Sequence, residues 1–141
     1  MNGNSPISYE TLIAAAGSVV IEPIGISMLP FLKEGRDSVR LVRPSVDPQK
    51  YDIVLYRVRG EYVLHRIIGF DGDSYIICGD NCRGWERGHG RKDIIAVVDE
   101  IYRNGKPEKP LVIPITNPLT RKNIDPVLPT AANVRFPRHC P

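Results

Sequence analysis

A serine between a glycine and a proline is the first candidate for chemistry in this sequence. Ser27 stands in Gly25-Ile26-Ser27-Met28-Leu29-Pro30, shortly after a β-branched run. A sharp bend of this kind can expose a serine hydroxyl and leave backbone N–H groups available to an oxyanion. The same composition also suits a turn serine that caps a backbone group, so the segment alone does not decide between the two roles.

The candidate metal ligands are Cys78, Cys82, His89, His139 and Cys140. Their spacing matches none of the usual zinc signatures, because no C-x-x-C pair is present. An odd number of cysteines without an export signal favours reduced thiols over a disulfide framework. We therefore expect neither a metal site nor a cofactor.

Five segments follow one another in the order of the motifs of a known superfamily. They are Gly25-Ile26-Ser27-Met28-Leu29-Pro30, Gly35-Arg36-Asp37-Ser38-Val39, Tyr51-Asp52-Ile53-Val54-Leu55-Tyr56, Leu64-His65-Arg66-Ile67 and Gly79-Asp80-Asn81. These segments resemble the successive boxes of the type I signal peptidases and the SOS-repressor cleavage domains. The resemblance covers about residues 18 to 105.

The resemblance implies a nucleophile and a base. In that superfamily the serine before the methionine attacks, and the residue ahead of the arginine in the fourth box takes its proton. Those positions are Ser27 and His65. Most bacterial members carry lysine as the base, whereas the endoplasmic-reticulum and archaeal type carries histidine, as this chain does. The unperturbed imidazole pKa of about 6.5 suits this task, although a lone histidine on a strand is more often a hydrogen-bonded structural residue.

An acidic partner for the base is also implied. Asp80 matches an aspartate that accompanies the histidine in such relatives, where it could orient the imidazole. Gly79-Asp80-Asn81 suits a turn equally well, so both interpretations stay open. Glu86, in the polar loop that follows, is either a second acidic partner or a solvent-exposed carboxylate.

Gly25 and Met28 are the expected oxyanion and substrate-binding residues. Many signal peptidases have a serine two residues before the nucleophile, where this chain has Gly25. The oxyanion would then depend on backbone N–H groups, with that of Ser27 first among them.

The surrounding elements are predicted to be mainly β. Ser8 can cap a short helix over residues 11–16, which Gly17 ends. Short β-branched runs predict strands over 19–21, 38–42, 53–58, 62–68, 74–78 and 94–98, with Arg59-Gly60-Glu61 as a hairpin turn and a loop over 83–92. The pattern predicts an antiparallel β domain with one N-terminal helix, and the resemblance implies the signal-peptidase fold.

Length and composition favour a single globular domain. We expect residues 1–106 to form a peptidase-like β domain and 107–141 an extended tail, because eight of the 13 prolines lie in that last segment. A net charge of +3 gives no support for nucleic-acid binding. The longest apolar run is far shorter than the roughly 20 residues of a membrane helix. No basic residue precedes it, so we expect no membrane anchor, no signal peptide and a cytoplasmic location.

These observations predict a serine endopeptidase with a Ser27–His65 dyad, which cleaves a peptide bond in a cytosolic peptide or protein. A self-cleaving regulator is one alternative, although the N-terminus has no room for a helix-turn-helix. A catalytically inactive peptidase-fold module for binding or regulation is the other. The sequence indicates neither the identity of the substrate nor the oligomeric state.

Overall fold

Residues 8–108, the part of the chain that the computed structural model describes, form one α-helix and an antiparallel sheet of eight strands. The elements are α1 (Tyr9–Ala16), β1 (Ser18–Ile21), β2 (Asp37–Val42), β3 (Ile53–Val58), β4 (Glu61–Asp71), β5 (Ser74–Cys78), β6 (Glu86–His89), a 3-10 turn (Arg91–Asp93), β7 (Ala96–Arg103) and β8 (Lys106–Glu108). The expected mainly β architecture with a short N-terminal helix is confirmed. The tail beyond Glu108 lies outside the described residues.

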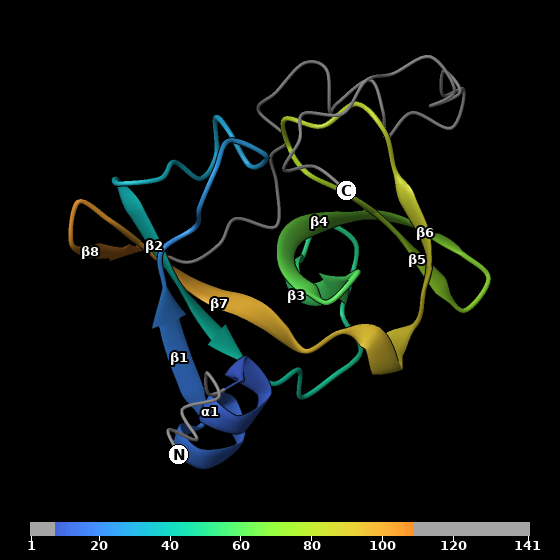
Figure 1. Cartoon of the computed structure of the whole chain (residues 1–141), viewed down its shortest axis with the longest axis horizontal. Helices are drawn as coiled ribbons and strands as arrows, with labels where there is room; N and C mark the ends of the chain where they lie inside the picture. Colours follow the sequence, from blue (N-terminus) through green and yellow to red (C-terminus); the bar gives the residue numbers. More distant parts are fainter. Residues whose placement is uncertain (1–7, 109–141) are drawn as a thin grey trace, which may run out of the picture.

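The strand order in the sheet is β1-β2-β7-β3-β4-β5-β6, with β8 also paired to β7. In Figure 1, β1, β2 and β8 lie on one side of the molecule, β5 and β6 lie on the other, and β7 runs between them. Strand β7 therefore joins β1 and β2 to the part of the sheet that contains β3, β4, β5 and β6.

The helix has the predicted signals at both ends. The Ser8 hydroxyl accepts a hydrogen bond from the Thr11 N–H at 3.1 Å. Gly17 has a φ of 84°, and its N–H donates to the Ile13 carbonyl. A left-handed residue at this position favours glycine. The helix begins at Tyr9, two residues earlier than the expected start.

The expected hairpin joins β3 to β4 through two residues in the left-handed region. Arg59 has a φ of 52° and Gly60 a φ of 82°, and Val58 pairs with Glu61. Two such residues in a row match the twist of the flanking strands. Asn104 and Gly105 repeat this arrangement between β7 and β8, so the last described strand spans the expected domain boundary.

Strands β6 and β7 differ from the sequence expectation for the same physical reason. Strand β6 lies inside the segment that we predicted to be a loop, because its residues pair with β5 in spite of their polar, glycine-containing sequence. Strand β7 begins at Ala96 and continues to Arg103, where pairing with β2 extends it beyond the apolar run. In both cases cross-strand pairing overrides local propensity.

Strand β3 separates two apolar cores. Ile53 and Leu55 belong to the core under α1, β1 and β2, whereas Val54 and Tyr56 belong to the core between β4, β5 and β7. Alternate side chains of a strand point to opposite faces, so β3 contributes to both cores. His65 pairs with Val54 across the hairpin and therefore lies on the face of the second core.

Candidate functional site

Ser27 lies in a turn between β1 and β2. The Leu29 N–H donates to the Ile26 carbonyl at 3.1 Å, and the Leu32 N–H donates to the Met28 carbonyl at 2.9 Å. Within residues 8–108, no hydrogen bond engages the Ser27 hydroxyl or its amide N–H. Both groups are therefore available to a bound molecule, as a nucleophile and an oxyanion donor require.

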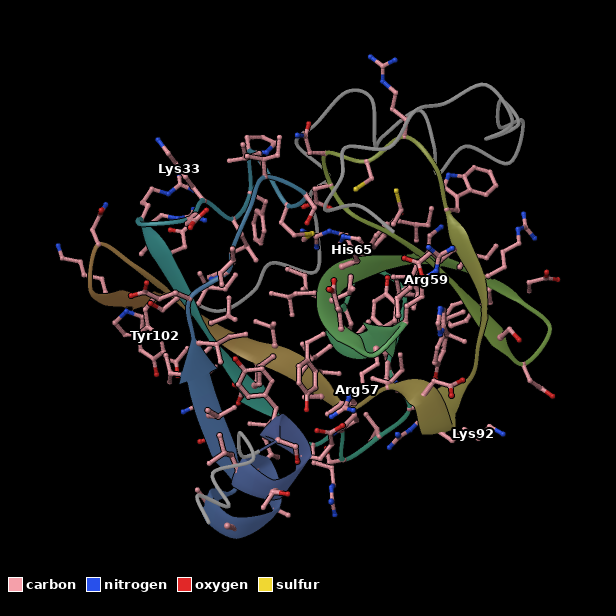
Figure 2. All side chains as sticks on the ribbon, in the orientation of Figure 1. Lys33, Arg57, Arg59, His65, Lys92 and Tyr102 are labelled. Carbon is pink, nitrogen blue, oxygen red and sulfur yellow. The ribbon has the colours of Figure 1, made fainter. Side chains whose placement is uncertain are left out.

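His65 is almost completely buried on β4, with an exposed fraction of 1%. Figure 2 shows it on the curled ribbon of the β3–β4 hairpin. Its Nδ1 atom lies 3.1 Å from the Tyr56 hydroxyl oxygen. Its Nε2 atom, which is also buried, points toward Gly79.

Gly79 brings the two predicted catalytic segments together. A Cβ atom at this position would lie 2.7 Å from the Ser27 carbonyl oxygen and 2.9 Å from His65 Nε2. Both atoms thus border the same small volume, which stays open because residue 79 has no side chain. The structure thus places the Ser27 backbone carbonyl and the imidazole on the same small volume.

Asn81 holds the Ser27 loop in position through two hydrogen bonds. Its backbone N–H donates to the Ser27 carbonyl at 2.8 Å, and its side-chain amide donates to the Ile26 carbonyl at 3.1 Å. The Gly-Asp-Asn box therefore holds the loop of the first box in position. Nothing in the sequence pattern alone indicates this role for Asn81.

Asp80 forms a buried ion pair with Arg66. Its two carboxylate oxygens each accept a hydrogen bond from the guanidinium at 2.8 Å, and both side chains are at most 1% exposed. Arg66 also donates to the Tyr51 carbonyl at 2.9 Å. The ion pair joins β4 to the loop after β5, and the Tyr51 contact joins it to the segment before β3. The expected role of Asp80 toward the imidazole stays a prediction.

Glu86 is the carboxylate that lies near the other side of the imidazole. Its Oε1 accepts from the Tyr56 hydroxyl at 2.8 Å and lies 3.9 Å from His65 Nδ1. Its side chain is only 15% exposed. Of our two interpretations for Glu86, the structure therefore favours a partner in the site over an exposed residue. Tyr56 was missed, although its place in the third box and the strand register could have put it beside His65.

The two expected oxyanion and substrate-binding residues have different surroundings. Gly25 adopts a left-handed conformation, with a φ of 88°, and its N–H donates to a Glu34 carboxylate oxygen at 2.9 Å. This amide is therefore already engaged. Met28 is buried, and its Sδ accepts from the Asp80 N–H at 3.5 Å.

A cavity of about 360 Å³ adjoins Ser27. Residues 21–25, Ser27 and Met28 line one part of it, and residues 61–64 of β4 line another. Gly25 and Met28 thus border the same cavity as the predicted nucleophile. Its dimensions and largely apolar lining are typical of a ligand pocket.

The structure bears on the expected reduced state of one cysteine. Cys78 is a buried free thiol, and burial, followed by the charges of Asp80 and Glu86, raises its pKa to about 12. The expectation of a reduced thiol is therefore confirmed for Cys78.

Within the described part of the chain, no cluster of histidine, cysteine and acidic side chains could hold a metal ion. His139 and Cys140, two of the candidate ligands, lie outside it. No helix between residues 8 and 108 is long and apolar enough to cross a bilayer. No family model, curated protein or solved structure matches the chain.

Proposed function

We propose that the chain is a serine endopeptidase of the type of the signal peptidases and SOS-repressor cleavage domains, with Ser27 as nucleophile and His65 as general base. The supporting observation is the contact at Gly79, where the Ser27 backbone and His65 Nε2 border one small volume. The adjoining cavity offers room for a peptide segment of the substrate. The signal-peptidase fold and a cytosolic peptide or protein substrate belong to the same proposal.

The mechanism begins with rotation of the Ser27 hydroxyl toward His65 Nε2. The serine oxygen attacks the peptide carbonyl while the imidazole takes its proton, and the imidazolium then protonates the leaving amine. The Ser27 N–H stabilises the negative charge on the carbonyl oxygen. Water, activated by the same imidazole, frees the acyl-enzyme. The required Oγ–Nε2 hydrogen bond forms only when the substrate is bound, as catalytic contacts often do.

A fluorophosphonate probe tests the nucleophile without a known substrate. The probe should label Ser27 in the unmodified protein, and labelling should be absent in Ser27→Ala and at least about 100-fold slower in His65→Ala. Ser45→Ala is the matched control, because it removes an exposed serine far from Gly79 in the chain. Labelling should also slow on acidification, since an imidazolium cannot accept the serine proton.

A catalytically inactive binding module is the second candidate function. The observation that favours it is the cavity, whose lining includes Ser27 but not His65. Such a module would bind a peptide in the cavity without reacting with the probe. A protein that folds normally and shows no labelling at Ser27 would therefore reject the peptidase proposal.

A further inference from the structure

A network of hydrogen-bonded side chains extends from His65 to His89 through Tyr56 and Glu86. The Tyr56 hydroxyl oxygen lies 3.1 Å from His65 Nδ1 and 2.8 Å from Glu86 Oε1. The second Glu86 oxygen lies 3.1 Å from His89 Nε2. The rings of His65 and His89 both face the Tyr56 ring edge to face, with centroids 6.2 and 4.8 Å away. Within this network, the five sequence boxes assign a role only to His65.

The position of the single phenol proton decides which imidazole nitrogen is basic. A tyrosine hydroxyl has one hydrogen, and Tyr56 donates it to the Glu86 carboxylate. At His65 the Tyr56 oxygen can therefore only accept, so Nδ1 must carry a hydrogen. With Nδ1 protonated in the neutral ring, the lone pair is on Nε2.

The surroundings keep the phenol in its protonated form. Burial, together with the charge and hydrogen bond of Glu86, raises the pKa of Tyr56 well above its ordinary value. His89 contacts the second oxygen of the Glu86 carboxylate and so limits its rotation. The direction of the hydrogen bonds is thus set by contacts on both sides of Tyr56.

We propose that Tyr56 and Glu86 are positioning residues that hold His65 in its Nδ1–H tautomer, so that the basic Nε2 atom faces Gly79 and the Ser27 loop. The assignment rests on the proposed function, in which Nε2 takes the serine proton. Neither residue contacts the reacting atoms. Their effect on catalysis passes through the imidazole.

Nitrogen NMR of the full chain, labelled with ¹⁵N at histidine, measures the tautomer directly. In the unmodified protein with a neutral imidazole, His65 Nδ1 should have the chemical shift of a protonated nitrogen and Nε2 that of an unprotonated one. Tyr56→Phe removes the acceptor and should produce a mixture of both tautomers. Tyr75→Phe, which removes a phenol hydroxyl from the same apolar core, is the control and should change neither shift.

Two substitutions of Glu86 give an independent test if Tyr56→Phe fails to fold. Glu86→Ala releases the Tyr56 proton, which can then be donated to Nδ1, so the population should move toward the Nε2–H tautomer. Glu86→Gln keeps an acceptor oxygen and should retain the original tautomer. An Nε2–H tautomer in the unmodified protein, or an unchanged spectrum in both Tyr56→Phe and Glu86→Ala, would overturn the assignment.

The rate of probe labelling at Ser27 connects the tautomer to catalysis. Tyr56→Phe and Glu86→Ala should each lower it by about tenfold or more, part of the roughly 10² to 10⁴ that a general base contributes. An unaltered rate in a variant with mixed tautomers would reject the catalytic role of Tyr56 and Glu86. Absence of labelling in the unmodified protein would instead reject the proposed function, while the NMR spectrum would still judge the tautomer.

Discussion

Gly79 shows how a single residue without a side chain can determine a site. The volume that its missing Cβ leaves open is bordered by Cys82 Sγ, the Ser27 carbonyl oxygen and His65 Nε2, all less than 3 Å from the Cβ position. One of these is a backbone atom, which cannot rotate away as the end of a flexible side chain can. The approach of the loop to the imidazole therefore requires glycine here.

Gly79→Ala should consequently destabilise the protein and inactivate the site. We expect the free energy of unfolding to fall by about 1–3 kcal/mol, the usual cost of inserting an extra carbon into a packed region, and labelling of Ser27 to be lost. Urea unfolding and the fluorophosphonate probe provide the two measurements. Gly69→Ala is the matched control, since its Cβ would make only an ordinary contact at 3.8 Å with Ile76. Equal effects of the two substitutions would contradict this account.

The sequence could predict the residues of the site better than their contacts. Ser27 and His65 stand in recognisable boxes, and the structure brings their segments together at Gly79. Tyr56 and Glu86 depend on strand register, because Tyr56 reaches His65 only through the β3–β4 pairing. Glu86 additionally requires β6, a strand whose polar residues carry no β-branched signal. Register and long-range pairing are properties of the folded sheet, so local pattern does not reveal them.

At the scale of elements, two consecutive residues of β4 point to opposite faces of the strand and have different roles. His65 faces the core that contains Tyr56, whereas Arg66 points to the opposite side, where Asp80 and the Tyr51 carbonyl hold its guanidinium. The Phe31 ring lies 4.8 Å from the same guanidinium. The position of β4 thus depends on an ion pair on the face opposite to His65.

Asp80→Asn should test this dependence. It leaves the Arg66 charge buried without its carboxylate, and breaking such a pair costs about 3–5 kcal/mol of unfolding free energy. Denaturant unfolding measures the loss. Asp71→Asn is the control, because it breaks the Arg87–Asp71 pair, whose side chains are more than half exposed, and should cost less than about 1 kcal/mol. Similar losses in the two variants would show that the Arg66–Asp80 pair does not anchor β4.

For the molecule as a whole, Asp37 connects the segment after Ser27 to strand β7. Its buried carboxylate accepts hydrogen bonds from Arg36, from the Lys33 N–H and from Arg103 on β7. Burial alone would raise the pKa of Asp37, but these hydrogen bonds outweigh it and lower the pKa below its ordinary value. The ionised form is therefore favoured by folding.

The sign of this shift predicts a loss of stability in acid. A carboxyl whose pKa is lower in the folded state stabilises the protein above its unfolded pKa of about 3.9, and this contribution disappears as the pH falls through the lower, folded value. Unfolding free energies between pH 6 and pH 2 should therefore decline less in Asp37→Asn than in the unmodified protein. The exposed Asp73→Asn should follow the unmodified protein. A parallel decline in Asp37→Asn would contradict the prediction.

The order of strands in the sheet also has a consequence for the biosynthesis of the molecule. The Ser27 loop lies between β1 and β2, and His65 lies on β4, yet β2 and β3 are joined only through β7. The hairpin of β3 and β4 is local and can form early, whereas pairing of β2 with β7 closes a long loop and is slow. A nascent chain therefore cannot join the two halves of the sheet until its last long strand has been synthesised and has entered the sheet. The proposed pair of Ser27 and His65 would lack this completed sheet while the chain is still being translated.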